Sequence, residues 1–273
     1  MVLKHEKPEA VAIARALGAW LRAEGHAVVV PPFHAQDVPE AAVVADDALA
    51  AAVDLLVVLG GDGTLLHGAG LLGMRPVPVL GVNLGRLGFL APFSPAEARE
   101  AVGAALAGRL ATEERMRLAM RLHRDGQWIE RQALNDVVIS QGSIARLVDL
   151  EATLDGRRLT HYRADGLIVA TPTGSTAYNL AAGGPIVAPG HAAMVITPIC
   201  PHTLSNRPLV VPAASRAEVR LVDPSHRVMV TVDGQEAFPL DDRVEITQGE
   251  PLVLYRSDKS YFEILREKLG WGG

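Results

Sequence analysis

A short apolar run that ends in a glycine turn is the feature that most limits how this chain can fold. Residues 54–59 read Asp-Leu-Leu-Val-Val-Leu, and residues 60–64 continue as Gly-Gly-Asp-Gly-Thr. Runs rich in Val and Leu are typical of strands that are buried on both faces of a parallel sheet, and ligands bind at the carboxyl ends of such strands. The pattern therefore predicts an α/β sheet with a ligand-binding glycine loop, followed by a helix over residues 64–72.

The glycine loop contains a carboxylate, Asp62, which an ordinary phosphate-binding loop would not. Glycines let the backbone approach a phosphate, and a helix that starts there aims free N–H groups at it. The loop lacks a Gly-Lys-Ser/Thr ending and the dinucleotide glycine spacing. A carboxylate beside phosphates needs a metal ion or a hydroxyl proton, which favours a kinase site. A turn whose Asp caps the helix explains the same residues, so the loop alone leaves both interpretations open.

Composition limits the class of protein. The chain has 273 residues, of which 49% are apolar, so it is long enough for one large domain or two moderate ones with a real core. A net charge of −5 argues against nucleic acid or an anionic membrane as the main partner. No membrane-length apolar run or signal peptide is apparent, which predicts a cytoplasmic protein. The single cysteine, Cys200, excludes an internal disulfide and lacks the companions of a zinc site.

The periodicity changes along the chain. Up to residue 93, helical and strand patterns alternate, with strands expected at 2–3, 27–30, 55–59 and 77–82, which predicts a Rossmann-like α/β domain over 1–93. A capping box at residues 94–97 starts a helix over 95–107. Apolar and polar residues then alternate between Asp-Gly turns, which predicts an antiparallel β-sandwich over 94–256 with strands that include 252–255. An amphipathic helix at 262–269 is expected to return to the first domain, so that 257–273 complete it.

Three further segments can bind a nucleotide. Residues 171–178 read Thr-Pro-Thr-Gly-Ser-Thr-Ala-Tyr, a loop with small hydroxyl donors and a ring, Tyr178, that can stack on a base. Asn135 and Asp136 precede an apolar strand, where they can read ribose hydroxyls or an adenine edge. Residues 85–89 place glycines and a candidate cation, Arg86, after another strand. Taken singly, each segment is also explained as an ordinary turn or a capped helix start.

In their order along the chain, these motifs resemble the NAD kinase family. The similarity rests on residues 60–64, 81–90, 135–136, 165–166 and 171–178, and it runs from about residue 54 to residue 271. The block 171–178 is highly specific, whereas the Gly-Gly-Asp-Gly loop is shared with diacylglycerol kinases and phosphofructokinases. The resemblance implies transfer of phosphate from ATP, or from polyphosphate, to the 2′-hydroxyl of the adenosine ribose of NAD. It also implies a cleft between the domains, Mg²⁺ carried with ATP, and a homodimer or homotetramer formed through the β domain.

The resemblance assigns site residues by position. Asp62 matches the catalytic aspartate, within a phosphate-binding loop of Gly60, Gly61, Gly63 and Thr64. His67 lies where relatives often carry a basic residue, and Asp136 replaces the usual Glu, so its contact is expected to be shorter or bridged by water. The implied substrate-binding residues are Gly63, His67, Phe89, Asn135, Asp136, Arg146, Arg163, Asp165, Thr173, Thr176, Ala177, Tyr178, Asn179, Leu180, Ala181 and Gln235.

The role of Asp62 has two interpretations. It accepts the proton of the ribose hydroxyl as a general base, or it only orients that hydroxyl or organises the metal ion. Other enzymes that use a similar glycine loop phosphorylate lipids or sugars, but they leave the block 171–178 unexplained. A sensor that binds NAD without turnover gains nothing from a carboxylate beside phosphates. A structural interaction protein leaves both loops without a purpose. The donor range, the acceptance of NADH and the choice of dimer or tetramer are not determined by the sequence.

Overall fold

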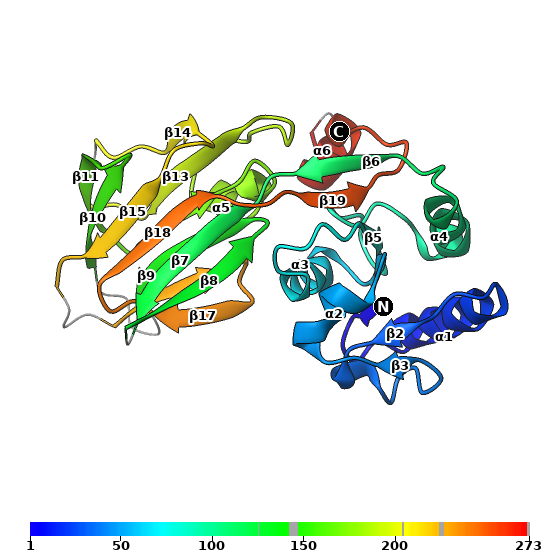
Figure 1. Cartoon of the computed structure of the whole chain (residues 1–273). Helices are drawn as coiled ribbons and strands as arrows, with labels where there is room; N and C mark the ends of the chain where they lie inside the picture. Colours follow the sequence, from blue (N-terminus) through cyan, green and yellow to red (C-terminus); the bar gives the residue numbers. More distant parts are fainter. Residues whose placement is uncertain (125, 142–146, 204, 224–226, 272–273) are drawn as a thin grey trace. The chain divides into compact units, whose positions relative to one another are not determined.

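The computed structural model describes residues 1–273 except 125, 142–146, 204, 224–226 and 272–273, and it divides the chain into two compact units (Figure 1). Unit 1 comprises Met1–Glu114 and Leu252–Gly273, and unit 2 comprises Arg115–Pro251. The division differs from the expected boundaries at 93/94 and 256/257: the segment 94–114 and the segment from Leu252 onward both fall in unit 1.

Unit 1 is built on a five-stranded sheet. The strands of this unit are β1 (Val2–Leu3), β2 (Val29–Val30), β3 (Ala42–Val43), β4 (Leu56–Leu59), β5 (Val79–Val82), β6 (Thr112–Arg115) and β19 (Leu252–Tyr255). The sheet order is β1-β4-β5-β19-β6, and the pairs β1/β4, β4/β5 and β5/β19 are parallel. All residues of β4 are buried, which confirms the buried strand predicted from its apolar run. The expected strand 27–30 is shorter, at Val29–Val30, and pairs with β3 in a separate two-stranded sheet.

Helices surround this sheet and begin where the sequence supplies helix-starting residues. Helix α1 starts with Pro8, and a capping box between Ser260 and Glu263 starts α6. The first turn of α3 contains Asp62, two residues earlier than the predicted start. The helical segments are α1 (Pro8–Ala23), η1 (Pro32–His34), α2 (Asp46–Ala52), α3 (Asp62–Leu71), η2 (Pro95–Glu97), α4 (Ala98–Leu106) and α6 (Tyr261–Leu269). None of the described helices has both the length and the apolar character needed to cross a membrane.

Packing explains why the segment 94–114 and β19 belong to unit 1. Helix α4 buries Ala98, Ala101 and Val102 in the same apolar core as Leu17 and Leu80. Strand β19 pairs with β5 rather than with a strand of the sandwich, through the register Leu254↔Val79. Its alternating pattern is typical of any half-covered strand, so the assignment of 252–255 to the sandwich was wrong: periodicity predicts a strand but does not select its partner.

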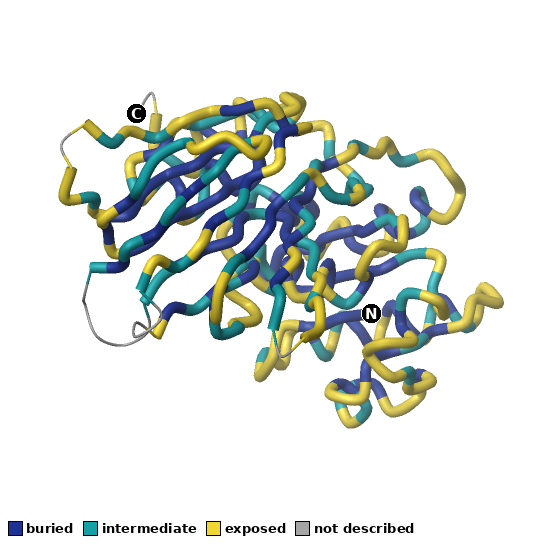
Figure 2. Tube along the Cα trace, turned by 60° about the vertical axis from the view of Figure 1, so that its left-hand side comes forward, coloured by how far each residue is buried: buried dark blue, intermediate teal, exposed yellow. Residues whose placement is uncertain are grey.

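Unit 2 is an antiparallel β-sandwich, as the alternating pattern predicted. Its strands are β7 (Leu118–Arg124), β8 (Gln127–Ala133), β9 (Asp136–Gln141), β10 (Val148–Leu154), β11 (Arg157–Ala164), β12 (Gly166–Ala170), β13 (Ala193–Ile199), β14 (Leu209–Pro212), β15 (Ala217–Leu221), β16 (Val228–Val232), β17 (Glu236–Pro239) and β18 (Arg243–Gln248). The two six-stranded sheets have the orders β11-β10-β15-β18-β7-β8 and β14-β13-β12-β9-β16-β17. Alternate residues of both sheets form one core, seen as buried stretches along the strands in Figure 2.

The connections of unit 2 hold the nucleotide-binding motifs. The chain passes from one sheet to the other between β8 and β9, at residues 134–135. After β12, residues 171–178 lead through η3 (Gly174–Thr176) into the short helix α5 (Tyr178–Ala181). The turns at Asp155-Gly156 and Asp233-Gly234 join β10 to β11 and β16 to β17, as predicted. Residue 125 of the third predicted turn lies outside the described residues.

Candidate functional site

The glycine loop of unit 1 leads from β4 into α3 and is hydrogen-bonded to the carboxyl end of β5. The backbone N–H of Gly60 donates to Val82 O at 2.9 Å, and Gly60 O accepts from the N–H of Leu84 at 3.3 Å. A Cβ at Gly60 would lie 2.3 Å from Oγ1 of Thr64, so any larger residue would displace the start of α3. The loop 60–64 and the loop 83–90 are therefore neighbours, as expected for the ends of adjacent parallel strands.

The carboxylate of Asp62 is held by the second of these loops. Its Oδ2 accepts the N–H of Phe89 at 2.9 Å, and its Oδ1 accepts the N–H of Leu90 at 3.0 Å. Gly88 makes room for it, because a Cβ there would lie 2.0 Å from Oδ1. Gly61 occupies the N-cap position of α3, and no side chain caps this helix. The interpretation of Asp62 as a helix cap is therefore wrong: the carboxylate is bound across two loops instead.

Two residues near this loop were not predicted from sequence. The buried amide of Asn83 donates to Arg86 O at 2.5 Å and accepts from the N–H of Gly85 at 3.1 Å, and so shapes the loop that holds Asp62. The ammonium group of Lys7 donates to Leu84 O and lies 3.5 Å from Glu9. Lys7 brings a cation to the carboxyl end of the sheet. The feature of the sequence that could have identified Lys7 is its position between an edge strand and the proline that starts α1.

The other candidates of unit 1 lie on α3 and on the second loop. His67 and Gly63 are exposed, and Thr64 and Arg86 lie at the surface ends of the same two loops. Phe89 is half-buried, with its ring centroid 6.2 Å from that of Tyr261 and 5.9 Å from the ammonium group of Lys268. Helix α6 thus packs on the residue that follows Gly88, which supports the loop around Asp62.

In unit 2, the segment 134–136 is bonded to the hydroxyl-rich loop. Thr171 is fully buried; its hydroxyl donates to Leu134 O at 2.6 Å, and its N–H donates to Asn135 O at 2.8 Å. The same hydroxyl accepts the N–H of Gly174 at 3.0 Å. A Cβ at Gly174 would lie 2.0 Å from Asn135 O. The two motifs are therefore one structural element, although Leu134 and Thr171 are 37 positions apart in the sequence.

Asp136 has a strongly perturbed carboxyl group. Its side chain is buried, and burial together with the nearby charge of Asp233 raises its pKa from 3.8 to about 7. Burial disfavours the charged form, and a like charge disfavours it further. A carboxyl group whose pKa lies near neutral pH in a ligand-binding loop is a candidate for binding hydroxyl groups, and its ionised form is the one in which both oxygens accept hydrogen bonds.

The remainder of the hydroxyl-rich loop is held mainly by its own polar groups. Asn179 is fully buried and donates to Ser175 O and Pro185 O, while its carbonyl accepts from the hydroxyl of Thr197. Thr173 is buried and lies 3.5 Å from the guanidinium of Arg115. The polar atoms of Asn179 are thus used inside the protein, which indicates a supporting role. Thr176, Ala177 and Leu180 are half-buried, and Tyr178 and Ala181 are exposed.

The outlying candidates of unit 2 lie on its surface. Arg163 is exposed and lies 3.3 Å from the carboxylate of Asp149, and Asp165 is exposed at the start of β12. Gln235 is exposed at the end of the β16–β17 turn, where its N–H donates to Val232 O. Arg146 lies outside the described residues.

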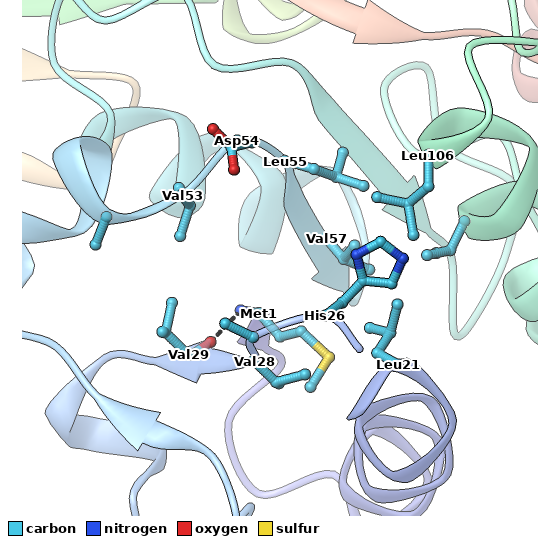
Figure 3. A pocket seen from close by; sticks show the side chains of 13 residues that line it. Met1, Leu21, His26, Val28, Val29, Val53, Asp54, Leu55, Val57 and Leu106 are labelled. Atoms are coloured by element: carbon cyan, nitrogen blue, oxygen red, sulfur yellow. Dashed lines mark hydrogen bonds between the residues drawn. The ribbon is translucent and has the colours of Figure 1, made fainter. Parts of the chain in front are cut away.

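A pocket of about 170 Å³ in unit 1 contains none of these candidates (Figure 3). Its lining includes His26 and Asp54 among mainly apolar side chains such as Val53 and Leu106. Asp54 and Leu55 precede β4, so the pocket lies at the amino end of this strand, opposite the glycine loop. Since open α/β sheets bind ligands at the carboxyl ends of their strands, we do not assign the reaction to this pocket.

The described residues contain no group of three or more His, Cys, Asp or Glu side chains that could hold a metal ion. The carboxylate of Asp62 uses one acceptor position of each oxygen on a backbone N–H, which leaves a second lone pair on each. These oxygens alone are too few to complete the coordination of a metal ion. They can complete the coordination of a divalent ion that is already bound to phosphate oxygens and needs few ligands from the protein.

Comparison with known proteins gives consistent matches over nearly the whole chain. Residues 1–110 match the ATP-NAD kinase N-terminal domain, and residues 134–254 match the ATP-NAD kinase C-terminal domain. The NAD kinase of Geotalea daltonii is 48% identical over 275 residues, which cover 98% of this chain and 96% of the relative. The NAD kinase of Syntrophobacter fumaroxidans is 44% identical over 280 residues, which cover 100% of this chain and 98% of the relative.

Two solved structures have the same architecture. Yeast NADH kinase complexed with NADH matches with a TM-score of 0.90 and 31% identity, over 99% of this chain and 86% of that chain. An NAD kinase from Archaeoglobus fulgidus in complex with ATP matches with a TM-score of 0.74 and 28% identity, over 90% of this chain and 99% of that chain. Asp62 falls within the first matched domain, and the segment from Asn135 to Gln235 falls within the second.

Proposed function

The chain belongs to the ATP-NAD kinase family and is an ATP-dependent NAD kinase, and from this premise we propose which of its residues carry the reaction. The phosphate acceptor is the 2′-hydroxyl of the adenosine ribose of NAD, and the product is NADP. The observation that carries the assignment is the carboxylate of Asp62, held by two backbone N–H groups at the carboxyl end of a buried strand.

We propose that Asp62 accepts the proton of the ribose hydroxyl as this oxygen attacks the terminal phosphorus of ATP. The bond to the leaving phosphate oxygen breaks as the new oxygen–phosphorus bond forms, and ADP leaves with the electron pair. Two N–H donors occupy one acceptor position on each carboxylate oxygen and leave the other position of each oxygen for the substrate. They also fix its direction, and positioning supplies most of the rate in phosphoryl transfer.

The phosphates are proposed to bind at Gly60, Gly61, Gly63 and Thr64, where the N-terminal turn of α3 offers free N–H groups. Lys7 is added to the predicted set as a cation at this end of the sheet. Enzymes of this kind use a divalent ion, and we propose Mg²⁺ bound mainly by ATP oxygens, with Asp62 the carboxylate available to it. When bound, this ion offsets the negative charge of the phosphates.

The dinucleotide is proposed to contact Asn135, Asp136 and the surface of residues 173–181, with Tyr178 as a stacking ring. Two solved relatives, one complexed with NADH and one with ATP, support these ligand classes for this chain. Use of polyphosphate, acceptance of NADH, Mg²⁺ as the metal, a dimer or tetramer, and a cytoplasmic location all stay predictions.

The test is the formation of NADP from NAD, ATP and Mg²⁺, followed with an NADP-specific dehydrogenase. General-base catalysis contributes roughly 10²–10⁴-fold, so Asp62→Asn should lower kcat by about that factor. Asp47→Asn is the matched control, because Asp47 is an exposed Asp in the first turn of α2 of the same unit. A near-normal kcat in Asp62→Asn would show that Asp62 is not the base. Failure of the wild-type enzyme to make NADP while it binds NAD would favour a sensor.

A further inference from the structure

Asp233 makes an unusual number of bonds to one short segment of unit 2. Its Oδ2 accepts the N–H of Leu134 at 2.7 Å, and its Oδ1 accepts the N–H of Asn135 at 2.7 Å and that of Asp136 at 3.0 Å. Its own N–H donates to Asp136 O at 2.9 Å. One residue of the β16–β17 turn therefore binds three consecutive residues that lie almost 100 positions earlier in the chain.

The carbonyl side of the same segment is bound by Thr171. Leu134 O and Asn135 O accept from the hydroxyl and the N–H of Thr171, respectively, and Asp136 O accepts from Asp233. Every backbone N–H and C=O of residues 134–136 thus has a partner, supplied by only two residues from two other loops. Leu134 and Asn135 lie where the chain crosses between sheets, outside the regular strand ladder, and Asp136 is the first residue of β9, paired with Ala170.

The backbone of Asp233 is suited to this task. Its φ is 50° and that of Gly234 is 67°, both in the left-handed region that primed hairpin turns require. The conformation directs the carboxylate back toward the segment 134–136 instead of toward solvent. The buried guanidinium of Arg117 acts on Asp233 electrostatically, and Arg117 itself donates to Glu250 O at 2.6 Å. Burial raises the pKa of Asp233, whereas the three backbone N–H donors and the charge of Arg117 act in the opposite direction and favour its ionised form.

We propose that Asp233 is a positioning residue for the NAD site, which fixes the direction of the Asn135 and Asp136 side chains by binding the backbone that carries them. The inference rests on the proposed contacts of Asn135 and Asp136 with the dinucleotide. It extends them, because Asp233 acts through these two residues and not on the substrate itself.

A charge effect distinguishes positioning by Asp233 from a general structural role. The negative charge of Asp233 raises the pKa of Asp136, second only to burial. Asp233→Asn keeps the size of the side chain but removes this charge, so the pKa of Asp136 should fall. It also turns an amide group toward one of the three N–H donors, which cannot then be satisfied. The groups that face this cluster are Asp136, Asp233, Arg117 and, through Arg117, Glu250.

The experiment compares steady-state kinetics of wild type, Asp233→Asn and Asp155→Asn over a pH range. Asp155 is the matched control: it starts the equivalent Asp-Gly turn of β10–β11, with φ 52°, and its carboxylate accepts a single N–H, from Arg216. We expect KM for NAD to rise about tenfold in Asp233→Asn, with smaller changes in kcat and in KM for ATP. We also expect the acidic limb of kcat/KM for NAD to move to lower pH, and both quantities to stay at wild-type values in Asp155→Asn.

The inference is overturned by an unchanged KM for NAD, by equal effects on NAD and ATP, or by an acidic limb that does not move. If Asp233→Asn does not fold, Asp233→Glu is used. It keeps the charge but lengthens the side chain, so KM for NAD should rise with the acidic limb in place, and an unchanged KM overturns the inference. Asn135→Ala separates the proposed NAD contact from the inference about Asp233. If Asn135→Ala binds NAD normally, the proposed contact of Asn135 with NAD is refuted. If Asn135→Ala raises KM for NAD but Asp233→Asn does not, only the inference about Asp233 is refuted.

Discussion

The backbone N–H of Phe89 lies 2.9 Å from a carboxylate oxygen of Asp62, so the loop after β5 holds the proposed catalytic group at the end of β4. Asp62 stands in the first turn of α3 and yet makes no bond that caps this helix. Its two acceptor bonds go to Phe89 and Leu90 instead. The position of the carboxylate therefore depends on the loop 83–90 as much as on its own helix.

Substitution of Gly88 tests this dependence without changing the carboxylate itself. A Cβ at residue 88 would lie 2.0 Å from Oδ1 of Asp62, so Gly88→Ala should displace the carboxylate. A misplacement of about 1 Å can cost about 100-fold in rate, and we expect kcat to fall by about that factor. Gly85→Ala is the control in the same loop, because a Cβ at residue 85 would lie 3.9 Å from Oδ1 of Asn83, an ordinary van der Waals contact. Equal activity of the two variants would contradict the proposed dependence.

Substitution of Gly174 tests the joint between the hydroxyl-rich loop and the segment 134–136. The new Cβ would lie 2.0 Å from the backbone oxygen of Asn135, which cannot move without breaking its bond to Thr171. Overpacking of this kind costs about 1–3 kcal/mol in the free energy of unfolding. Gly174→Ala should also raise KM for NAD. Chemical denaturation and kinetics, with exposed Gly190→Ala as the control, measure both effects, and a Gly174→Ala variant as stable as Gly190→Ala would refute the first.

The buried carboxyl group of Asp136 should make stability depend on pH. Its folded-state pKa, about 7, lies above the ordinary value of 3.8, so the folded protein holds a proton between these values that the unfolded chain has released. Stability therefore falls as pH rises from about 4 to about 7, and the loss is complete above that range.

Asp136→Asn imitates the protonated form and removes this loss. At pH 8 the variant should be more stable than wild type by roughly 1–4 kcal/mol, and the difference should shrink as the pH is lowered to about 5. Urea denaturation at several pH values measures it, with Asp155→Asn as an exposed control. A stability difference that does not change with pH would count against the buried titration.

Removal of divalent metal should stop the reaction and leave the fold intact. The described residues contain no cluster of three metal-binding side chains, so the ion is expected to enter with ATP and to contribute nothing to folding. A chelator should abolish NADP formation without changing the thermal unfolding midpoint, and added Mg²⁺ should restore activity. A midpoint that falls with the chelator would reveal a structural metal instead.

Much of the fold follows from local patterns. The apolar run of β4 and the capping box at residues 94–97 each form the predicted element, because burial and a paired cap act within a few residues. The alternation in unit 2 likewise produced a β-sandwich. Strand partners were less predictable, since β19 has a sandwich-like pattern but pairs with β5 in unit 1.

The sequence by itself determined the family, the order of the motifs and the identity of Asp62, since these depend on which residues occur and at what spacing. The tertiary structure alone decided what each polar group bonds to. It showed that Asp62 is bound by the loop after β5, that Asn179 is used internally, and that Asp233 binds the backbone of residues 134–136. The bonds of the Asp62 and Asp233 carboxylates join residues 27 to 99 positions apart, and no local pattern encodes the chain path that brings them together.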